Sequence, residues 1–217
     1  MRGVFVTGTG TEVGKTVVAA SIARTLFADG EDVAVFKPAM SGLDEGGESD
    51  AELLRRAAGS AQPVDGIAPY RYGPPVSPHL GAELAGEAID PERLVALARA
   101  AGGAADFLVC EGVGGLLVPL TLEYSVRDFA IDLGLPLVIA ASPGLGTINH
   151  TLLTVESAKA AGLEPRLVVL TPWPREPTAV ERSNLEAVER LGGVPVERLS
   201  WLDLETPSSW PPLRPGG

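Results

Sequence analysis

The chain has 217 residues, a length that suits one domain with a sizeable core. Its 28 acidic and 17 basic side chains give a formal net charge of -11, which argues against nucleic acid or an anionic membrane as partner, since both require clustered Lys and Arg. The single cysteine, Cys110, and the lack of a signal-peptide pattern or membrane-length apolar run predict a soluble cytoplasmic protein without an internal disulfide.

Apolar runs of strand length alternate with helical patterns along the chain. This alternation is typical of a parallel sheet covered by helices on both faces, so we expect a single-domain α/β fold. The predicted strands are, in chain order, 4–7, 33–37, 107–111, 137–141, 167–171 and a weaker one near 194–196. The predicted helices lie between them, at 15–28, 50–58, 79–85, 91–101, 126–133, 149–161 and 179–191.

Several of these helices have recognisable ends. Ser49 with Glu52 is typical of a capping box, and Asp90 before Pro91 of an N-cap followed by a first-turn proline. Helices are expected to stop at Gly30, Gly134, Gly162 and Gly192. Residues 206–217 contain four prolines and end in two glycines, so we assign residues 1–205 to the domain and expect a loosely packed tail without a role in chemistry.

The first predicted strand leads through a glycine-rich loop into an alanine-rich helix. Residues 8–16 read G-T-G-T-E-V-G-K-T. Backbone N–H groups of such a loop surround an anion and the helix N-terminus adds partial positive charge, while Lys15 would add a full charge and Thr16 a Mg²⁺ ligand. The loop is one residue longer than the common G-x-x-x-x-G-K-[ST] pattern. The order of strand, loop and helix favours a nucleoside triphosphate site over a glycine turn that binds nothing.

Polar residues end the predicted strands, and ligands of parallel α/β sheets gather at that edge. Lys37 ends the second strand, where its ammonium is expected to stabilise a transferring phosphoryl group; the alternative is a surface lysine. Asp50 is either a metal ligand or a favourable charge at a helix start. Glu111 ends the third strand and is expected to complete a Mg²⁺ shell. The G-V-G-G run at 112–115 either lets backbone approach a ligand or forms a tight turn.

Three other reactive side chains are interpreted as structural. Cys110 points away from Glu111 because side chains alternate along a strand, and a buried thiol behaves as a small hydrophobe. His79 and His150 lie near helix starts and have no adjacent nucleophile or carboxylate pair. Two separated histidines do not make a metal site.

Five segments together resemble the dethiobiotin synthetase family. They are V-T-G-T-G-T-E-V-G-K-T at 6–16, K-P-A-M-S-G at 37–42, S-D at 49–50, E-G-V-G-G at 111–115 and G-L-G-T-I-N-H-T-L-L-T at 144–154; S-P-H at 77–79 and S-W-L at 200–202 also fit. The resemblance extends over roughly residues 4–154. It implies a P-loop NTPase-like fold and an enzyme that uses ATP and Mg²⁺ to join CO₂ to 7,8-diaminononanoate, closing the ureido ring of dethiobiotin.

The resemblance also assigns roles to residues of this chain. The implied catalytic positions are Lys37, Lys15 and Thr11, and the implied metal ligands are Thr16, Asp50 and Glu111. The implied nucleotide positions are Gly10, Thr11, Glu12, Val13, Gly14, Lys15, Thr16, Val17, Asp50, Glu111, Gly112, Val113, Gly114, Thr171, Pro172, Ser200, Trp201 and Leu202. The implied substrate positions are Ser41, Gly144, Leu145, Gly146, Thr147 and Asn149, with the 144–149 segment helping to bind the substrate carboxylate across a homodimer interface.

One segment departs from the family pattern. Where many relatives have an asparagine-aspartate pair after the fifth strand, this chain has Thr171 and Pro172, followed by Trp173 and Pro174. The asparagine amide that can read a purine edge is therefore missing, and proline has no N–H to replace it. The sequence predicts relaxed nucleotide choice, with other nucleoside triphosphates accepted besides ATP and with Trp173 as a stacking surface.

Three other functions share parts of this pattern. A P-loop switch ATPase of the cell-division or partition type usually has a lysine near the start of the loop, where residues 9–12 here read T-G-T-E. A cobalamin-pathway amide synthase needs an appended glutaminase domain, for which this length leaves no room. A nucleotide kinase needs an arginine-rich lid that is not apparent. The switch ATPase remains the main alternative to the enzyme.

Overall fold

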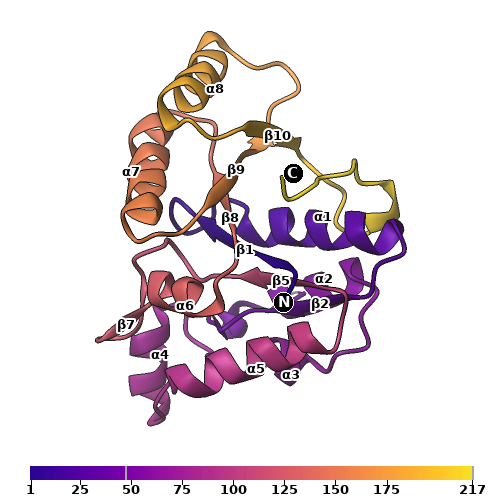
Figure 1. The fold of residues 1–217 in the computed structure, drawn as a ribbon, viewed down its shortest axis with the longest axis vertical. Helices are drawn as coiled ribbons and strands as arrows, with labels where there is room; N and C mark the ends of the chain where they lie inside the picture. The colour runs from indigo at the N-terminus through magenta and orange to yellow at the C-terminus, as the bar shows by residue number, and fades with distance from the viewer. Residues whose placement is uncertain (47, 217) are drawn as a thin grey trace.

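A six-stranded parallel sheet forms the centre of the structure, a computed structural model that describes residues 1–46 and 48–216 (Figure 1). The strand order is β10-β9-β8-β1-β5-β2, and every neighbouring pair is parallel. The strands are β1 (Gly3–Gly8), β2 (Val33–Phe36), β5 (Phe107–Glu111), β8 (Leu137–Ala141), β9 (Pro165–Trp173) and β10 (Val196–Ser200). The central strands are almost wholly buried, as expected for a parallel sheet covered on both faces.

Helices cover the sheet from both sides. Because side chains alternate along each strand, successive residues of a strand pack against the helices on opposite faces. On one face α1 (Lys15–Ala28), α2 (Asp50–Ala57) and α3 (Val64–Ile67) pack on Val4, Val6 and Val109. On the other, Phe5 and Ile139 belong to the clusters under the remaining helices. These are α4 (Pro78–Ala85), α5 (Pro91–Gly103), α6 (Val126–Leu133), α7 (Thr147–Ala160) and α8 (Ala179–Gly192). In Figure 1, α1 lies to the right of the sheet and α6 and α7 lie to its left.

The predicted α/β fold class is confirmed, and several elements have the predicted bounds. Helices α1 and α6 and strands β5 and β8 begin and end where the sequence predicts. The capping box at Ser49 and Glu52 and the N-cap at Asp90 are present. Gly134 ends α6 with a φ of 64°. Helix α8 ends one residue later than predicted, because its C-cap is Gly193 and not Gly192.

Some strand bounds differ from the prediction. Strand β2 ends at Phe36, so Lys37 lies just beyond it, and β9 continues to Trp173. The last strand is β10, which begins at Val196 and not near residue 194. The sequence pattern did not predict the short elements β3 (Ala39–Met40), η1 (Leu43–Glu45), β4 (Tyr70–Arg71), β6 (Pro119–Thr121), β7 (Tyr124–Ser125), η2 (Pro207–Ser209) and α3. Elements this short have too few residues to show a hydrophobic period.

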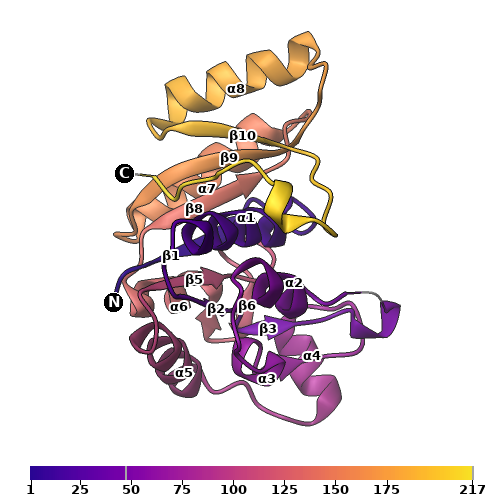
Figure 2. The same cartoon turned by 90° about the vertical axis from the view of Figure 1, so that its right-hand side faces the viewer.

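The expectation of a loosely packed tail is wrong. Trp210 and Leu213 are buried in the same cluster as α1, and the Leu213 N–H donates to the Thr25 hydroxyl at 2.9 Å. Arg214 forms an ion pair with Asp29 at the end of α1. Figure 2 shows this yellow segment lying alongside α1. The prolines prevent regular structure, but two large apolar side chains are enough to fix the segment on the core.

None of the helices that the structure describes is long and apolar enough to cross a bilayer.

Candidate active site

Two cavities open at the carboxyl edge of the sheet and meet at one residue of the glycine-rich loop. The larger, the polar cavity, has a volume of about 710 Å³ and lies between the loop, Lys37 and α2. The smaller, the apolar cavity, has about 510 Å³ and lies between the loop, residues 115–119 and α7. Thr11 lines both cavities. A group bound in one cavity is therefore adjacent to a group bound in the other.

A buried ammonium between two carboxylates forms the floor of the polar cavity. Lys37 follows the end of β2, and its Nζ donates to Glu111 Oε1 at 2.7 Å and to Asp50 Oδ2. Glu111 ends the neighbouring strand β5, and Asp50 is the first residue of α2. The parallel order of β2 and β5 brings Lys37 and Glu111 to the same edge, and the capping box at Ser49 fixes where Asp50 begins the helix.

The charges of this triad determine one another's protonation. Burial alone would lower the pKa of Lys37, but the charges of Glu111 and Asp50 outweigh it and raise the pKa above its ordinary value. Burial raises the pKa of Glu111, and the Lys37 charge only partly offsets this. Asp50 is half-buried, and the Lys37 charge holds its pKa below the usual range despite the burial. Lys37 therefore stays positively charged at neutral pH.

The glycine-rich loop is shaped for close approach to a ligand. Gly14 has a φ of 83°, and a Cβ there would stand 2.7 Å from the Thr171 methyl carbon, so only glycine fits. Glu12 also has a positive φ, of 60°, which is uncommon outside glycine. Lys15 Nζ donates to the Gly10 carbonyl at 2.8 Å, and burial lowers the pKa of this ammonium. The loop therefore encloses a cationic, backbone-lined concavity of the kind that binds phosphate.

A divalent cation fits the donors beside Lys37. The Thr16 hydroxyl donates to Glu111 Oε1 at 2.8 Å, while the other carboxylate oxygen, Oε2, is buried without a hydrogen-bond partner among the described residues. Within residues 1–46 and 48–216 no three His, Cys, Asp or Glu side chains are grouped around a metal position. One hydroxyl and two carboxylates are the protein ligands that Mg²⁺ commonly takes, with phosphate and water oxygens as the others.

The structure brings most of the implied nucleotide and metal residues to the polar cavity. Its lining includes Thr11, Glu12, Gly14, Lys15, Thr16, Val17, Lys37, Ser41, Asp50, Glu111, Val113 and Gly114. Gly10 lines the apolar cavity, and Val13 packs at the edge of the core. A Cβ on Gly112 would lie 2.9 Å from Val126, so this glycine lets β5 pass close to α6.

Other implied residues lie outside these two cavities. Thr171 is buried beside Gly14, and Ser200 pairs with Trp173 across β10 and β9. Trp201 is 81% exposed, and Leu202 packs on the core next to it. The segment with Gly144, Leu145, Gly146, Thr147 and Asn149 leads into α7, and Leu145 is 97% exposed. These residues do not line either cavity of the described chain.

The prediction that Trp173 offers a stacking surface is wrong. Its side chain is only 7% exposed and packs among Leu170, Val188 and Val194, with Arg198 over its ring at 5.6 Å. Residue 173 still belongs to β9, which is longer than the sequence predicts. An indole buried between β9 and α8 cannot reach a nucleotide base.

Sequence reasoning missed several contributors to the cavities. Leu204 and Glu205, beyond β10, line the polar cavity, although no motif singled them out. His150, interpreted as structural, lines the apolar cavity together with Leu153 and Ser157 of α7. The spacing of 150, 153 and 157 on one helical face was the available signal for that wall.

Comparisons with known proteins identify relatives of this chain. A family model described as an AAA domain matches residues 2–203. The chain is 43% identical to the ATP-dependent dethiobiotin synthetase BioD of Anaeromyxobacter dehalogenans, covering 93% of this chain and 91% of that protein. It is 40% identical to the BioD protein of Rhodococcus erythropolis and 36% identical to that of Bacillus subtilis, covering 88% and 90% of this chain and 85% of each relative.

Among solved structures, the chain is similar to a ParA family ATPase from Chlorobium tepidum, with a TM-score of 0.57 and 15% identity over 95% of this chain and 87% of that one. It is also similar to the cell division protein FtsY from Thermotoga maritima, with a TM-score of 0.55 and 15% identity over 99% of this chain and 65% of that one. At this identity the likeness shows the fold alone. It confirms the predicted P-loop NTPase-like architecture.

Proposed function

This chain belongs to the ATP-dependent dethiobiotin synthetase family, ligases that form C–N bonds, and from that premise we propose how its two cavities divide the reaction. The polar cavity takes the triphosphate of ATP, and the apolar cavity takes the hydrocarbon chain of 7,8-diaminononanoate. The observation that carries this assignment is that Thr11 lines both cavities. The γ-phosphate and the amines then lie close enough to react.

The reaction has three steps. One amine of the diamine adds to CO₂ and loses a proton, giving a carbamate. A carbamate oxygen attacks the γ-phosphorus of ATP and ADP leaves, which gives a carbamic–phosphoric anhydride. The second amine attacks the anhydride carbon, the C–O bond to phosphate breaks, and the five-membered ring closes with loss of a proton. Holding the second amine in place makes this last step intramolecular, worth about 7–11 kcal/mol in well-oriented cases.

The two lysines act as electrostatic clamps in this scheme. Negative charge builds on the γ-phosphate and on the carbamate oxygens, and preorganised cations stabilise it most where water is excluded. The raised pKa of Lys37 supports this role, because a lysine that stays protonated serves as charge and donor and not as a base. Lys15 lies on the loop side and Lys37 on the sheet side of the same cavity.

Mg²⁺ would be held by Thr16, Asp50 and Glu111. The unpartnered Oε2 of Glu111 supports this assignment. When bound, the ion neutralises charge on the phosphate oxygens and orients the terminal phosphate. Without it, the same carboxylates would repel the triphosphate, so these residues serve the reaction only as a metal-dependent set.

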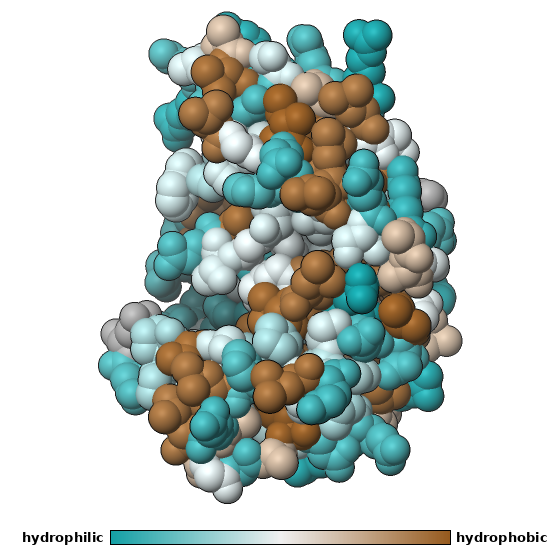
Figure 3. All heavy atoms as spheres, turned by 90° about the vertical axis from the view of Figure 1, so that its left-hand side faces the viewer, coloured by the Kyte–Doolittle hydropathy of each residue, from teal (hydrophilic) through white to brown (hydrophobic). Residues whose placement is uncertain are grey.

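We infer that the active form is a homodimer in which segment 144–149 reaches the partner's apolar cavity. Two exposed leucines, Leu117 and Leu153, line that cavity, and Leu122 and Leu145 are exposed as well. Figure 3 views the side of the molecule that carries α4, α6 and α7, and shows several groups of hydrophobic residues on it. Exposed apolar patches of this kind are typical of interfaces.

A cytoplasmic location also stays a prediction, based on the unpaired thiol of Cys110.

Nucleotide choice is proposed to be relaxed. The buried Thr171 and the following Pro172 take the place of the family's asparagine-aspartate pair, and a buried threonine cannot read a purine edge through an amide. Turnover measured with ATP, GTP and CTP at equal concentration is expected to be of the same order for all three. Strict dependence on ATP would contradict the proposal.

The main alternative is a switch ATPase that acts through partner binding. The ParA-type structural neighbour shares only the fold, while the relatives with high coverage are named dethiobiotin synthetases. The deciding experiment incubates the protein with diaminononanoate, ¹³C-bicarbonate and Mg-ATP and identifies the product by mass. The cyclic urea with one ¹³C atom is expected, with none formed when ATP is omitted. Hydrolysis of ATP without this product would favour the switch.

A further inference from the structure

The outer wall of the polar cavity comes from a segment without regular structure. Leu204 and Glu205 follow β10 and line the cavity together with the glycine-rich loop; we call them its outer wall. Leu204 is partly exposed, so burial alone does not hold the segment in place. Leu202 and Trp210 pack on the core on either side of it, and hydrogen bonds to the backbone carbonyls of residues 204–205 hold the stretch between them.

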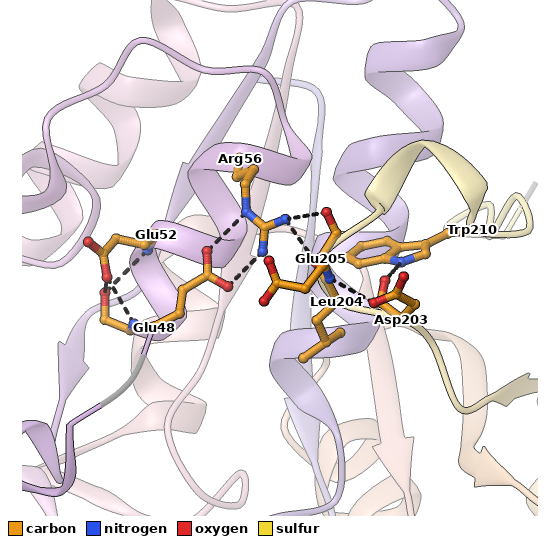
Figure 4. Close-up of polar contacts among 8 residues, drawn as sticks. Glu48, Glu52, Arg56, Asp203, Leu204, Glu205 and Trp210 are labelled. Atoms are coloured by element: carbon orange, nitrogen blue, oxygen red, sulfur yellow. Dashed lines mark hydrogen bonds and ion pairs between the residues drawn. The ribbon is translucent and has the colours of Figure 1, made fainter.

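One guanidinium makes two of these bonds, as Figure 4 shows. Arg56 Nη1 donates to the Leu204 carbonyl at 2.8 Å and to the Glu205 carbonyl at 3.3 Å. From its other edge, Nε and Nη2 donate to the two carboxylate oxygens of Glu48 at 3.0 and 2.7 Å. A planar fork with five donors can satisfy both partners at once, which an ammonium cannot do.

The helix that carries Arg56 also carries Asp50, one of the two carboxylates that pair with Lys37. Asp50 is the first residue of α2 and pairs with Lys37, while Arg56 lies in the last turn of the same helix. Helix α2 therefore connects the floor of the polar cavity to its outer wall. A nucleotide that rests against residues 204–205 is placed relative to Lys37 through this helix.

Arg56 also lies among several carboxylates. Glu48, Glu52 and Glu205 gather at the surface beside the cavity. Glu48, through its hydrogen bonds and charge, raises the pKa of Arg56, whose guanidinium is charged at neutral pH in any case. Arg55 lines the same surface group, so the two arginines share its charge, but only the hydrogen bonds of Arg56 to the Leu204 and Glu205 carbonyls tie the group to residues 204–205 among the described residues.

We propose that Arg56 is a positioning residue for nucleotide binding: it fixes residues 204–205 as the outer wall of the polar cavity and joins them to α2. The proposal rests on the assignment of that cavity to the nucleotide. It predicts that losing Arg56 weakens nucleotide binding and leaves the chemical step at saturation nearly unchanged, because Arg56 touches none of the reacting atoms.

The test compares Arg56→Ala and Arg56→Lys with Arg55→Ala, which removes the neighbouring exposed arginine of the same helix. Calorimetric titration with a non-hydrolysable ATP analogue and Mg²⁺ gives the dissociation constant. Arg56→Ala is expected to bind about fivefold more weakly, roughly 1 kcal/mol, and Arg56→Lys at least threefold more weakly because the fork is lost. Arg55→Ala should stay within twofold of the wild type. In turnover, KM for ATP should rise in Arg56→Ala while kcat changes less than twofold.

Wild-type affinity in Arg56→Ala would overturn the proposal, and so would equal losses in Arg55→Ala and Arg56→Ala. A fall in kcat with unchanged analogue binding would place the effect of Arg56 on the chemical step and would also overturn it. Melting temperatures of all variants, measured alongside, show that each is folded at the assay temperature. Analogue binding does not require the reaction, so a wild type that binds the analogue but forms no cyclic urea refutes the proposed function without deciding this test.

Discussion

Lys37 occupies a position where its own charge is needed to keep two neighbours charged. Its ammonium is buried, Glu111 is fully buried, and the two are only 2.7 Å apart. Removing one member of a buried pair leaves the other uncompensated, which typically costs about 3–5 kcal/mol. The residue that we assign to catalysis therefore also contributes to stability, and its variants need both measurements.

Lys37→Ala is expected to abolish turnover and to make folding stability strongly dependent on pH. Burial raises the pKa of Glu111 already in the presence of Lys37, and removing the cation raises it further. A carboxyl whose pKa is raised by folding binds a proton more readily in the folded state, so stability falls as pH rises from the unfolded pKa through the folded one. Chemical denaturation at pH 5.5 and 7.5 should show a more stable variant at the lower pH. Equal stability at both would contradict the buried-pair description.

Residue types and spacing were enough to predict Lys15, Thr16, Lys37, Asp50 and Glu111 as one site. Each follows a strand or begins a helix, so topology alone brings them together. Leu204 and Glu205 could not be predicted in this way, because they lie in an irregular segment held by a distant arginine. The burial of Trp173 was also missed, because β9 continues two residues beyond its predicted end. In a strand, the position of a residue decides whether its side chain faces the core or solvent.

Helix α2 is only eight residues long, and its start is fixed by a capping box. The Ser49 hydroxyl accepts from the Glu52 N–H at 3.3 Å, and the Glu52 carboxylate accepts from the Ser49 N–H at 2.9 Å. A helix of two turns depends on its caps and on packing, since nucleation alone is unfavourable. The geometry of Asp50 is therefore tied to these two bonds.

Ser49→Ala is expected to lower stability by about 1 kcal/mol and to raise KM for Mg-ATP. Thr178→Ala is the matched control, because Thr178 and Glu181 form the same motif at the start of α8, away from both cavities. It should lose similar stability with unchanged KM. Denaturant unfolding and initial rates measure both quantities. An equal KM for Mg-ATP in the two variants would show that the capping box at Ser49 does not position Asp50 for nucleotide binding.

Long elements with a clear period were predictable, and short ones were not. Helix α6 begins with a capping box at Ser125 and ends at Gly134, and α1 follows directly on the glycine-rich loop. By contrast, β3, β4, β6 and β7 have two or three residues each and form only where a loop is held against another. The pairing of β3 with β4 is non-local, so no local pattern specifies it, and the β6–β7 hairpin is too short to show a strand period. The end of β10 is set by its pairing with β9 in the same way.

The C-terminal segment contributes to the core of the whole molecule. Trp210 packs on the cluster of α1, and its Nε1 donates to the Asp203 carbonyl at 2.7 Å. Trp210→Ala is expected to lower the free energy of unfolding by about 3 kcal/mol, measured by denaturant titration. Trp201→Ala, at the 81% exposed indole, should change it little. A Trp210→Ala variant as stable as the wild type would support the expectation of a loosely packed tail and contradict this account.

Assembly is predicted to depend on the exposed segment before α7. Leu145→Asp places a charge in the proposed interface, so light scattering should find a monomer where the wild type is a dimer. Turnover should fall while binding of a nucleotide analogue persists, because one protomer contains the polar cavity. Leu191→Asp, an exposed leucine at the far end of α8, serves as the control and should remain dimeric. A wild type that is monomeric and fully active would refute the interface.

The meeting of both cavities at Thr11 has a consequence for inhibitor chemistry. A single molecule that joins a phosphate mimic to an alkyl amine would occupy the polar and the apolar cavity at once, with its linker next to Thr11. Tethering turns the second contact into an intramolecular event, so such a bisubstrate compound gains affinity through effective concentration without any stronger individual contact. Short, rigid spacers should serve best, because the two cavities share a lining residue.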